Sequence, residues 1–298
     1  MTKRVGFAAI VGRPNVGKST LINSMLGERL AIVTPKAQTT RHRIMGVLND
    51  GGSQVVFLDT PGFHLSEKPL NKAMNEVVDA VIDDADAVLL LIDARNPEDP
   101  MERGLYDRIG SKRCIVVVNK SDLVGRDTFE GIALALRDGW GAREVVFISA
   151  LTGDGVPQLI QAIKQRLPEG EPFYPDESYT THPVRFLAAE IIREQVFLRM
   201  HQEIPYSAAV EIEEFKDPKA ADDITRIRAA IVVERESQKG MVIGKGGRSI
   251  KEIGTAARKG IEELVGGNVF LDLRVRVQKD WTKDPEAIKR LGYSTQLD

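Results

Sequence analysis

A glycine-rich octapeptide near the start of the sequence has the residue types that hold the phosphates of a nucleotide. It spans residues 12–19 and reads Gly-Arg-Pro-Asn-Val-Gly-Lys-Ser. Glycines let backbone N–H groups wrap around phosphates, and a following helix adds the positive end of its dipole. In this pattern Lys18 would reach the β- and γ-phosphate oxygens, and Ser19 would ligate Mg²⁺. The predicted phosphate-binding residues are Gly12, Asn15, Val16, Gly17, Lys18, Ser19 and Thr20.

A second motif, Asn-Lys-Ser-Asp at 119–122, predicts which base the nucleotide carries. It closes an apolar run of strand length, which places it at the carboxyl edge of a parallel sheet, where α/β domains bind ligands. Asp122 can accept both the N1–H and the exocyclic amino hydrogens of guanine, a pair that adenine does not offer. Taken alone, the tetrapeptide would be an ordinary surface turn. The predicted guanine-binding residues are Asn119, Lys120 and Asp122, joined by Ser149, Ala150 and Leu151 through backbone groups.

Further polar residues predict a Mg²⁺ site and a hydrolytic site without a glutamine. Asp59, in Asp-Thr-Pro-Gly, would hold Mg²⁺ through water, with a structural aspartate before a turn as the alternative. Thr40 would supply a second hydroxyl ligand, with Thr39 the near alternative. Phe63 stands where a glutamine commonly orients the attacking water, so slow intrinsic hydrolysis is expected. The predicted metal ligands are therefore Ser19, Thr40 and Asp59, and the predicted catalytic residues are Lys18, Thr40 and Gly62.

A second glycine-rich loop, Gly-Lys-Gly-Gly at 244–247, is typical of a nucleic-acid backbone clamp. The net charge of the chain is −2, yet between positions 235 and 259 seven basic residues meet only two acidic ones. In KH modules a Gly-x-x-Gly turn between two helices holds about four nucleotides. A tight helix–helix turn is the alternative. The predicted RNA-binding residues are Lys239, Gly244, Lys245, Gly246, Gly247 and Arg248.

The elements that must position the first motifs predict an α/β domain over residues 1–167. Apolar runs alternate with amphipathic segments, which is typical of a mostly parallel, doubly wound sheet covered on both faces. Strand 44–48 is expected to pair antiparallel with its successor, because the link at 49–53 is too short for a helical crossover. The other expected strands are 5–11, 54–59, 87–93, 114–119 and 145–149, with helices at 69–82 and 156–167.

Residues 168–183 concentrate proline, glycine and acidic side chains, which is typical of a linker. Residues 184–298 change to an α+β pattern that predicts the RNA-binding domain and a C-terminal extension. A helix is expected at 186–200 and strands at 210–215 and 227–234, followed by the helix after the glycine loop and a last strand. The expected core positions of these last two elements are Ile250, Ile253, Ala257, Ile261, Leu264, Val269, Leu271, Leu273, Val275 and Val277.

Composition sets the class of protein. The 298 residues are enough for two domains, and no apolar run approaches the ~18–20 residues that span a bilayer. Cys114 is the only cysteine, so it forms no intramolecular disulfide, and a reducing cytoplasm is the expected compartment.

Taken together, the five guanine-nucleotide motifs resemble those of the translation-factor-related GTPases. Gln-Thr-Thr-Arg-His-Arg at 38–43 and the segment 235–247 are similar to the Era family of bacterial ribosome-assembly GTPases, and this resemblance covers nearly the whole chain. It implies a P-loop GTPase domain followed by a KH domain. It also implies a monomer that binds GTP or GDP with Mg²⁺, binds small-subunit ribosomal RNA near its 3′ end, and is released by GTP during 30S subunit maturation. Peripheral association with the inner membrane is implied too, and the sequence shows no determinant for it.

Asn15 leaves two interpretations open. In related GTPases that lack the glutamine, an asparagine at this place helps to coordinate K⁺, and an amide oxygen is a suitable hard ligand. The alternative is that Asn15 only hydrogen-bonds within the loop or the switch.

Two other classes of function compete with a GTP-controlled switch. A metabolic GTP-dependent enzyme would need a second catalytic constellation, but the four histidines are scattered, at positions 42, 64, 182 and 201. A constitutive RNA-binding scaffold with a nucleotide site of only structural role is the second competitor.

Overall fold

The computed structural model describes residues 3–34, 36, 42, 44–63, 68–110, 113–201, 203–218, 220 and 223–293. The chain forms two compact units, which divide between Thr181 and His182, and residues 68–70 are grouped with the second unit.

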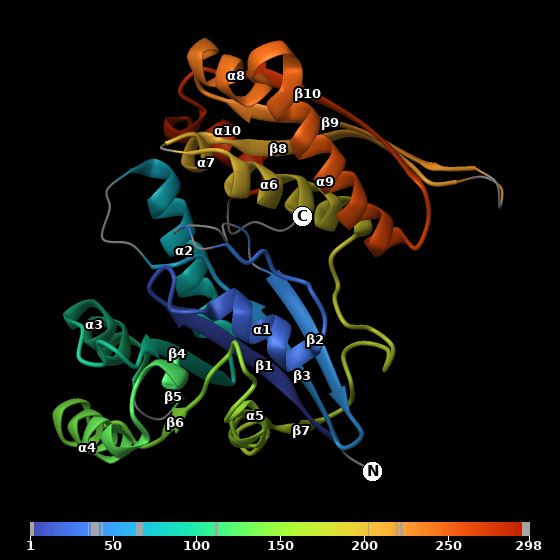
Figure 1. Cartoon of the computed structure of the whole chain (residues 1–298). Helices are drawn as coiled ribbons and strands as arrows, with labels where there is room; N and C mark the ends of the chain where they lie inside the picture. The colour runs from blue at the N-terminus through green and yellow to red at the C-terminus, as the bar shows by residue number, and fades with distance from the viewer. Residues whose placement is uncertain are drawn as a thin grey trace. The chain divides into compact units, whose positions relative to one another are not determined.

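The first unit contains one seven-stranded sheet with the order β2-β3-β1-β4-β5-β6, and β7 pairs with the start of β1 (Figure 1). All neighbours are parallel except β2 with β3 and β7 with β1. The mostly parallel sheet and its antiparallel edge pair are therefore confirmed. The strands are β1 (Lys3–Gly12), β2 (Ile44–Asp50), β3 (Ser53–Asp59), β4 (Ala87–Asp93), β5 (Cys114–Asn119), β6 (Val145–Phe147) and β7 (Glu169–Gly170).

Helices cover both faces of this sheet. One face packs against α2, α3 and α4 in a single buried cluster, while α1 and α5 contact each other and β1 on the opposite face (Figure 1). Every residue of β3, β4 and β5 is buried as a result, which explains their continuous apolar sequences. The helices are α1 (Lys18–Leu26), α2 (Pro69–Asp84), α3 (Pro100–Ile109), α4 (Phe129–Trp140) and α5 (Val156–Lys164).

Two of the expected elements end earlier than the sequence predicts. The strand expected to reach residue 149 ends at Phe147, because Ser149 N–H donates within its own loop, to Asp154 O. The helix expected to reach residue 167 ends at Lys164, because the N–H groups of Arg166 and Leu167 bond carbonyls only three residues back and tighten the turn.

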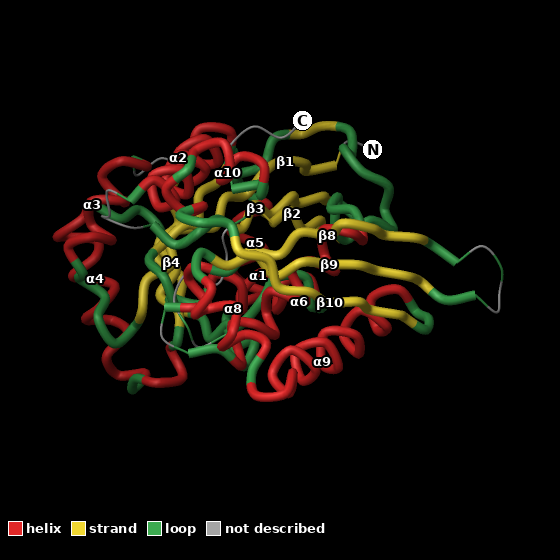
Figure 2. The backbone as a smooth tube through the Cα atoms, turned by 90° about the horizontal axis from the view of Figure 1, so that it is seen from above, coloured by secondary structure: helices red, strands yellow, loops and turns green. Residues whose placement is uncertain are grey.

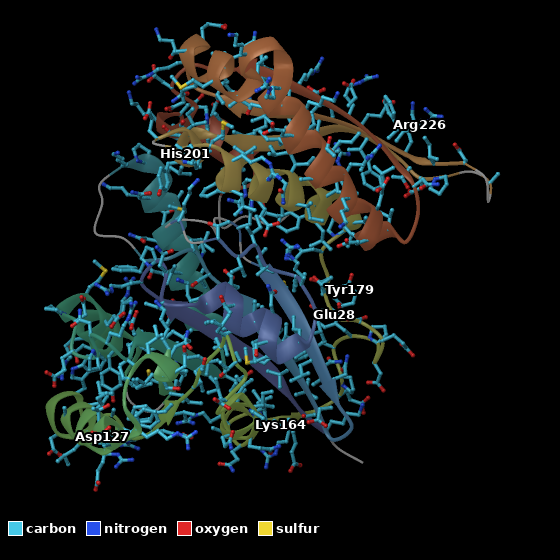
Figure 3. All side chains as sticks on the ribbon, viewed as in Figure 1. Glu28, Asp127, Lys164, Tyr179, His201 and Arg226 are labelled. Carbon is cyan, nitrogen blue, oxygen red and sulfur yellow. The ribbon has the colours of Figure 1, made fainter. Side chains whose placement is uncertain are left out.

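The segment after α5 is held along the edge of the first unit. The wholly buried Gln54 accepts N–H groups from Phe173 and Tyr174 at 2.7 and 3.0 Å and donates to Tyr174 O at 2.8 Å. Further along, Val47 N–H on β2 donates to Tyr179 O at 2.9 Å; Figure 3 labels Tyr179 where the segment runs beside this edge of the sheet. Residues 168–181 therefore add backbone pairing to β1 and β2, in addition to connecting the two units.

The second unit has a three-stranded sheet of order β10-β9-β8 with helices packed on one face (Figure 2). β10 is parallel to β9, and β8 is antiparallel to it. Its elements are α6 (Val184–Arg199), α7 (Ile204–Ser207), β8 (Ala209–Lys216), β9 (Thr225–Val233), α8 (Glu236–Ile243), α9 (Arg248–Val265), β10 (Val269–Val277) and α10 (Pro285–Arg290).

The core of the second unit matches the predicted periodicity with two exceptions. The alternate apolar residues of β9 and β10 face the helices as predicted, and Ile253, Ala257 and Ile261 of α9 are buried among them. The predicted Ile250 is only half-buried and lies outside this cluster. In addition Val265, and not the predicted Leu264, packs against the cluster. Positions three and four residues after Ile261 both lie near the same helix face, so spacing alone does not distinguish them. In the described part of the chain, no helix has the length and apolar content that crossing a membrane requires.

Candidate nucleotide site and glycine loop

The phosphate loop joins β1 to α1 through glycines that the geometry demands. Gly17 has φ 103°, and a Cβ atom there would lie 2.2 Å from Asn119 Nδ2, so a larger residue has no room. No side chain caps α1 at Gly17. The first-turn N–H groups, which include those of Ser19 and Thr20, therefore form the kind of donor set that binds an anion at a helix N-terminus.

Lys18 is buried and points back over the loop. Its Nζ donates to Gly12 O at 3.0 Å and to Arg13 O at 2.9 Å. Burial lowers the pKa of Lys18 to about 8, while the nearby carboxylates of Asp59 and Glu102 oppose this shift. A bound phosphate would favour the charged form of this ammonium, because an opposite charge nearby raises a lysine pKa.

Two hard oxygen donors meet beside Lys18. Ser19 Oγ donates to Asp59 Oδ2 at 3.1 Å, and Asp59 is wholly buried at the end of β3. A hydroxyl and a carboxylate are oxygen ligands that Mg²⁺ accepts, so these residues fit the predicted metal site. The predicted third ligand, Thr40, and its alternative Thr39 lie outside the described residues.

The Asp-Thr-Pro-Gly motif is in contact with the phosphate loop. The backbone of Gly62 lies against Pro14, since a Cβ at Gly62 would be 2.8 Å from Pro14 Cγ. Phe63 N–H donates to Gly12 O at 3.2 Å, and its ring packs at the margin of the core. The Phe63 side chain thus has a packing role in this structure.

Asn119 ties three loops together at the carboxyl edge of the sheet. Its Nδ2 donates to Val16 O in the phosphate loop at 2.7 Å, and its Oδ1 accepts Ala150 N–H at 2.9 Å. Lys120, held at φ 63°, donates from Nζ to Asn15 O at 2.7 Å. The predicted guanine residues and the predicted phosphate residues are therefore brought to one place.

The remaining guanine residues lie in the two turns beside Asn119. Asp122 is exposed in a one-turn 3₁₀ helix, Ser121–Leu123. Ser149 is buried, and its Oγ accepts Thr152 N–H at 3.2 Å, whereas Leu151 is exposed. The side chain of Asp122 is thus accessible to a base, whereas Ser149 holds its turn through the hydrogen bond from Thr152 N–H.

Sequence reasoning missed a set of charged residues around the phosphate loop. Arg13 contacts the carboxylates of Asp99 and Glu102 on the α3 side. Asp93, at the end of β4, accepts Lys120 Nζ at 2.8 Å, and hydrogen bonds from Arg95 hold the pKa of Asp93 well below its usual range. Arg95 is only two positions from Asp93, but the carboxylate partners of Arg13 and Lys120 lie 27 to 89 positions away in the chain, so no local pattern marks these contacts.

The second glycine loop connects α8 to α9 and also needs glycine. Gly244 has φ 73°, and a Cβ there would lie 2.7 Å from Ser249 Cβ. Gly246 and Gly247 follow at φ 61° and 76°, and the side chains of Lys245 and Arg248 are exposed. Lys239 lies on α8, 3.8 Å from Glu236. The six predicted RNA-binding residues therefore belong to one helix–turn–helix segment.

Comparisons with known proteins match a GTPase domain and a KH domain. A family described as 50S ribosome-binding GTPase matches residues 7–120, and the KH domain family matches residues 203–282. GTPase Era of Syntrophus aciditrophicus (strain SB) is 45% identical over 291 residues, covering 97% of this chain and 95% of that protein.

Two solved structures are also similar to the whole chain. An Aquifex aeolicus Era variant bound to GDP.AlF4- matches with a TM-score of 0.94 and 39% identity, over 98% of this chain and 99% of that one. A crystal structure of Era in complex with MgGDPNP and nucleotides 1506–1542 of 16S ribosomal RNA matches with a TM-score of 0.93 and 40% identity, over the same shares.

The exposed Asp122 provides a test of base recognition. We expect Asp122→Asn to weaken GTP binding by about 10²–10⁴-fold, because its amide group no longer accepts both guanine hydrogens. The same variant should gain affinity for xanthosine triphosphate, whose carbonyl replaces the amino group. Titration with fluorescent analogues of both nucleotides measures this change in base preference. The control is Asp127→Asn, which removes another exposed carboxylate. Equal losses for the two nucleotides would contradict the assignment.

Proposed function

The chain belongs to the Era family of GTPases, and from this premise we propose that it is a GTP-binding and GTP-hydrolysing switch that acts on ribosomal RNA. The observation that carries the proposal is that Asn119 joins the predicted phosphate and guanine residues in one chain, and that the same chain has a glycine loop at 244–247 within the residues that match the KH family. The RNA of the Era complex, nucleotides 1506–1542 of 16S ribosomal RNA, is the proposed partner. The protein would act as a cytoplasmic monomer on the maturing 30S subunit.

For the nucleotide site we propose the following division of roles. The backbone N–H groups that would bind the phosphates are those of Gly12, Asn15, Val16, Gly17, Lys18, Ser19 and Thr20. The side chain of Lys18 would contact the β- and γ-oxygens. Asp122 would read guanine, with Asn119 holding the base-side turn against the loop. Mg²⁺, present in the Era complex as MgGDPNP, would be held by Ser19, Asp59 and Thr40 and would neutralise charge on the phosphates. With Phe63 at the glutamine position, slow intrinsic turnover is expected.

For the RNA site we propose that the loop at 244–247 holds the RNA backbone. Its positive-φ glycines leave the backbone without side chains at Gly246 and Gly247, where a Cβ would meet no protein atom within 4 Å. The exposed Lys245 and Arg248 supply positive charge beside this bare surface.

A matched pair of glycines tests the RNA site. Gly246 in the loop and Gly266 at the other end of α9 have φ 61° and 65°, and a Cβ at either would meet nothing within 4 Å. We expect Gly246→Asp to weaken binding of the 1506–1542 RNA by at least about tenfold, because a carboxylate then faces the phosphates. Gly266→Asp, equal in strain and charge, should bind like the wild type. Equal losses in the two variants, measured by fluorescence anisotropy, would remove the loop from the interface.

We further propose that residues 168–183 form the linker between a GTPase domain, residues 1–167, and an RNA-binding domain, residues 184–298, and that this linker carries the nucleotide signal. β2 directly follows the stretch 34–43 that contains Thr40. Thr180 Oγ1 donates to Met45 O in β2 at 2.7 Å, and Asn49 Nδ2 donates to Ser178 O at 3.1 Å. A nucleotide-dependent shift at the start of β2 would therefore reach Thr180, which is two residues before the second unit begins.

Thr180→Val tests the linker proposal. In the wild type, RNA affinity should differ between the GTP-analogue and GDP states by about 5- to 150-fold, the usual range of allosteric coupling. Thr180→Val loses one hydrogen bond to β2, worth roughly 1 kcal/mol, and should reduce this ratio about fivefold without changing GTP affinity. Ser178→Ala, which keeps the backbone carbonyl that Asn49 contacts, is the control.

The outcomes of this experiment separate the linker from the switch. A wild-type ratio of one would favour the constitutive RNA-binding scaffold. A wild-type ratio that Thr180→Val leaves unchanged would show that the signal takes another route.

We also propose that K⁺ assists hydrolysis through Asn15. The residue is exposed at φ 64°, and its backbone carbonyl is fixed by Lys120, so its amide oxygen is presented from a defined loop. K⁺ would supply positive charge where other GTPases use an arginine finger.

A comparison of cations tests this role of Asn15. We expect single-turnover hydrolysis to be at least about tenfold faster in K⁺ than in Na⁺ at equal ionic strength, because the ion takes the place of a group worth about 10³–10⁵ in rate. Asn15→Ala should abolish the difference while keeping the slow Na⁺ rate. Equal rates of the wild type in both salts would exclude the role.

A further inference from the structure

The phosphate loop is held from outside the nucleotide motifs by helix α3. Arg13 Nε donates to Glu102 Oε1 at 3.2 Å, and its Nη1 contacts Asp99 Oδ2. Asp99 is itself fixed, because its side chain caps α3 by accepting Met101 N–H at 2.9 Å. The guanidinium of Arg13 thus contacts two carboxylates whose positions are set by α3.

Glu102 is the more demanding of these two partners. It is wholly buried, and its second oxygen, Oε2, has no hydrogen-bond partner among the described residues. An ionised carboxylate in such a place is tolerated only while its partner stays close, and losing one member of a buried ion pair is costly. The pair therefore fixes the position of Arg13 more firmly than an exposed salt bridge would.

The backbone of Arg13 is part of the nucleotide site. Its carbonyl, together with that of Gly12, accepts Lys18 Nζ, and Gly12 O also accepts Phe63 N–H. A displacement of Arg13 would move the carbonyls that orient Lys18 and that join the loop to the Asp-Thr-Pro-Gly motif. The contacts of the Arg13 side chain therefore affect the phosphate site through the backbone of the same residue.

We propose that Glu102 is a positioning residue for the GTPase reaction, which acts through Arg13 to hold the phosphate loop in its nucleotide-binding conformation. The inference rests on the proposed function only in taking residues 12–19 as the phosphate site. Helix α3, which lies outside the guanine-nucleotide motifs, would thereby help to retain the nucleotide.

The charges around Glu102 give this role a pH dependence. Burial raises the pKa of Glu102 to about 7; Arg13 in the loop opposes the rise, and Asp99 on its own helix and Asp93 at the end of β4 add to it. Lys18 on α1 is the other charged neighbour. Only the ionised form of Glu102 attracts Arg13 by charge. The ion pair is therefore fully formed above this pKa and is lost as the pH falls through it.

The test is the dissociation rate of a fluorescent GDP analogue, measured by stopped flow from about pH 6 to about pH 8.5, on either side of the raised pKa. Glu102→Gln keeps the shape of the protonated acid and has no charge. We expect it to release nucleotide about tenfold faster than the wild type at the upper pH, the loss of a charge-assisted contact, and at nearly the wild-type rate at the lower pH. The ratio of variant to wild type cancels the titration of the nucleotide's own phosphates.

Two controls separate positioning from a general structural defect. Asp107→Asn removes a charge from the same helix at an exposed pair with Arg103 and should leave the pH profile unchanged. In an Arg13→Ala background, Glu102→Gln should add nothing, because the two residues act as a unit.

Several results would overturn the proposal. One is that Glu102→Gln releases nucleotide at the wild-type rate at every pH. Another is that Glu102→Gln accelerates release as much in the Arg13→Ala background as in the wild type. If Glu102→Gln does not fold, Arg13→Lys is measured instead. Lysine keeps the positive charge but cannot donate to both carboxylates as the guanidinium does. Nucleotide release from Arg13→Lys at the wild-type rate would contradict the proposal. In each of these cases the nucleotide still binds, so the proposed function is not tested by the failure.

Discussion

The side-chain amide of Asn119 is the interaction on which the nucleotide site depends. It donates to the phosphate loop at Val16 and accepts from the turn at Ala150, so groups from three separate loops share one set of hydrogen bonds. The amide also explains the glycine at position 17, since a Cβ atom there would occupy the place of Asn119 Nδ2. The predicted guanine residues and the predicted phosphate residues are consequently joined by hydrogen bonds at the carboxyl edge of the sheet.

A second constraint joins this assembly to the rest of the chain. Residues 168–181 pair with the starting residues of β1 and with the edge of β2, and the buried Gln54 closes the segment onto the sheet. The segment is therefore attached to β2, the strand that follows residues 34–43. Under the proposed function, these hydrogen bonds are the contacts through which a conformational change at the start of β2 would reach the second unit.

Much of the fold and of the site follows from local sequence patterns, for physical reasons. Strands buried on both faces are mostly apolar, so β3, β4 and β5 are visible as apolar runs whose polar residues lie near the strand ends. The glycines at 12, 17, 244, 246 and 247 all occupy positive-φ positions, which makes both loops recognisable as motifs. What the sequence did not reveal depends on long-range partners. The pairs Arg13–Glu102 and Lys120–Asp93, and the anchoring of Tyr179 on β2, are specified by the packed structure and have no local periodicity.

The central claim is that nucleotide state and RNA binding share one free-energy coupling, and reciprocity tests it most directly. If GTP changes the affinity for RNA relative to GDP by some factor, then RNA must change the preference for GTP over GDP by the same factor. The measurement is the affinity of non-hydrolysable GTP and of GDP analogues, with and without saturating RNA of nucleotides 1506–1542. If the two sites are coupled, RNA shifts the ratio of the two nucleotide affinities by at least about fivefold. An identical ratio with and without RNA would contradict the coupling and leave two independent sites on one chain.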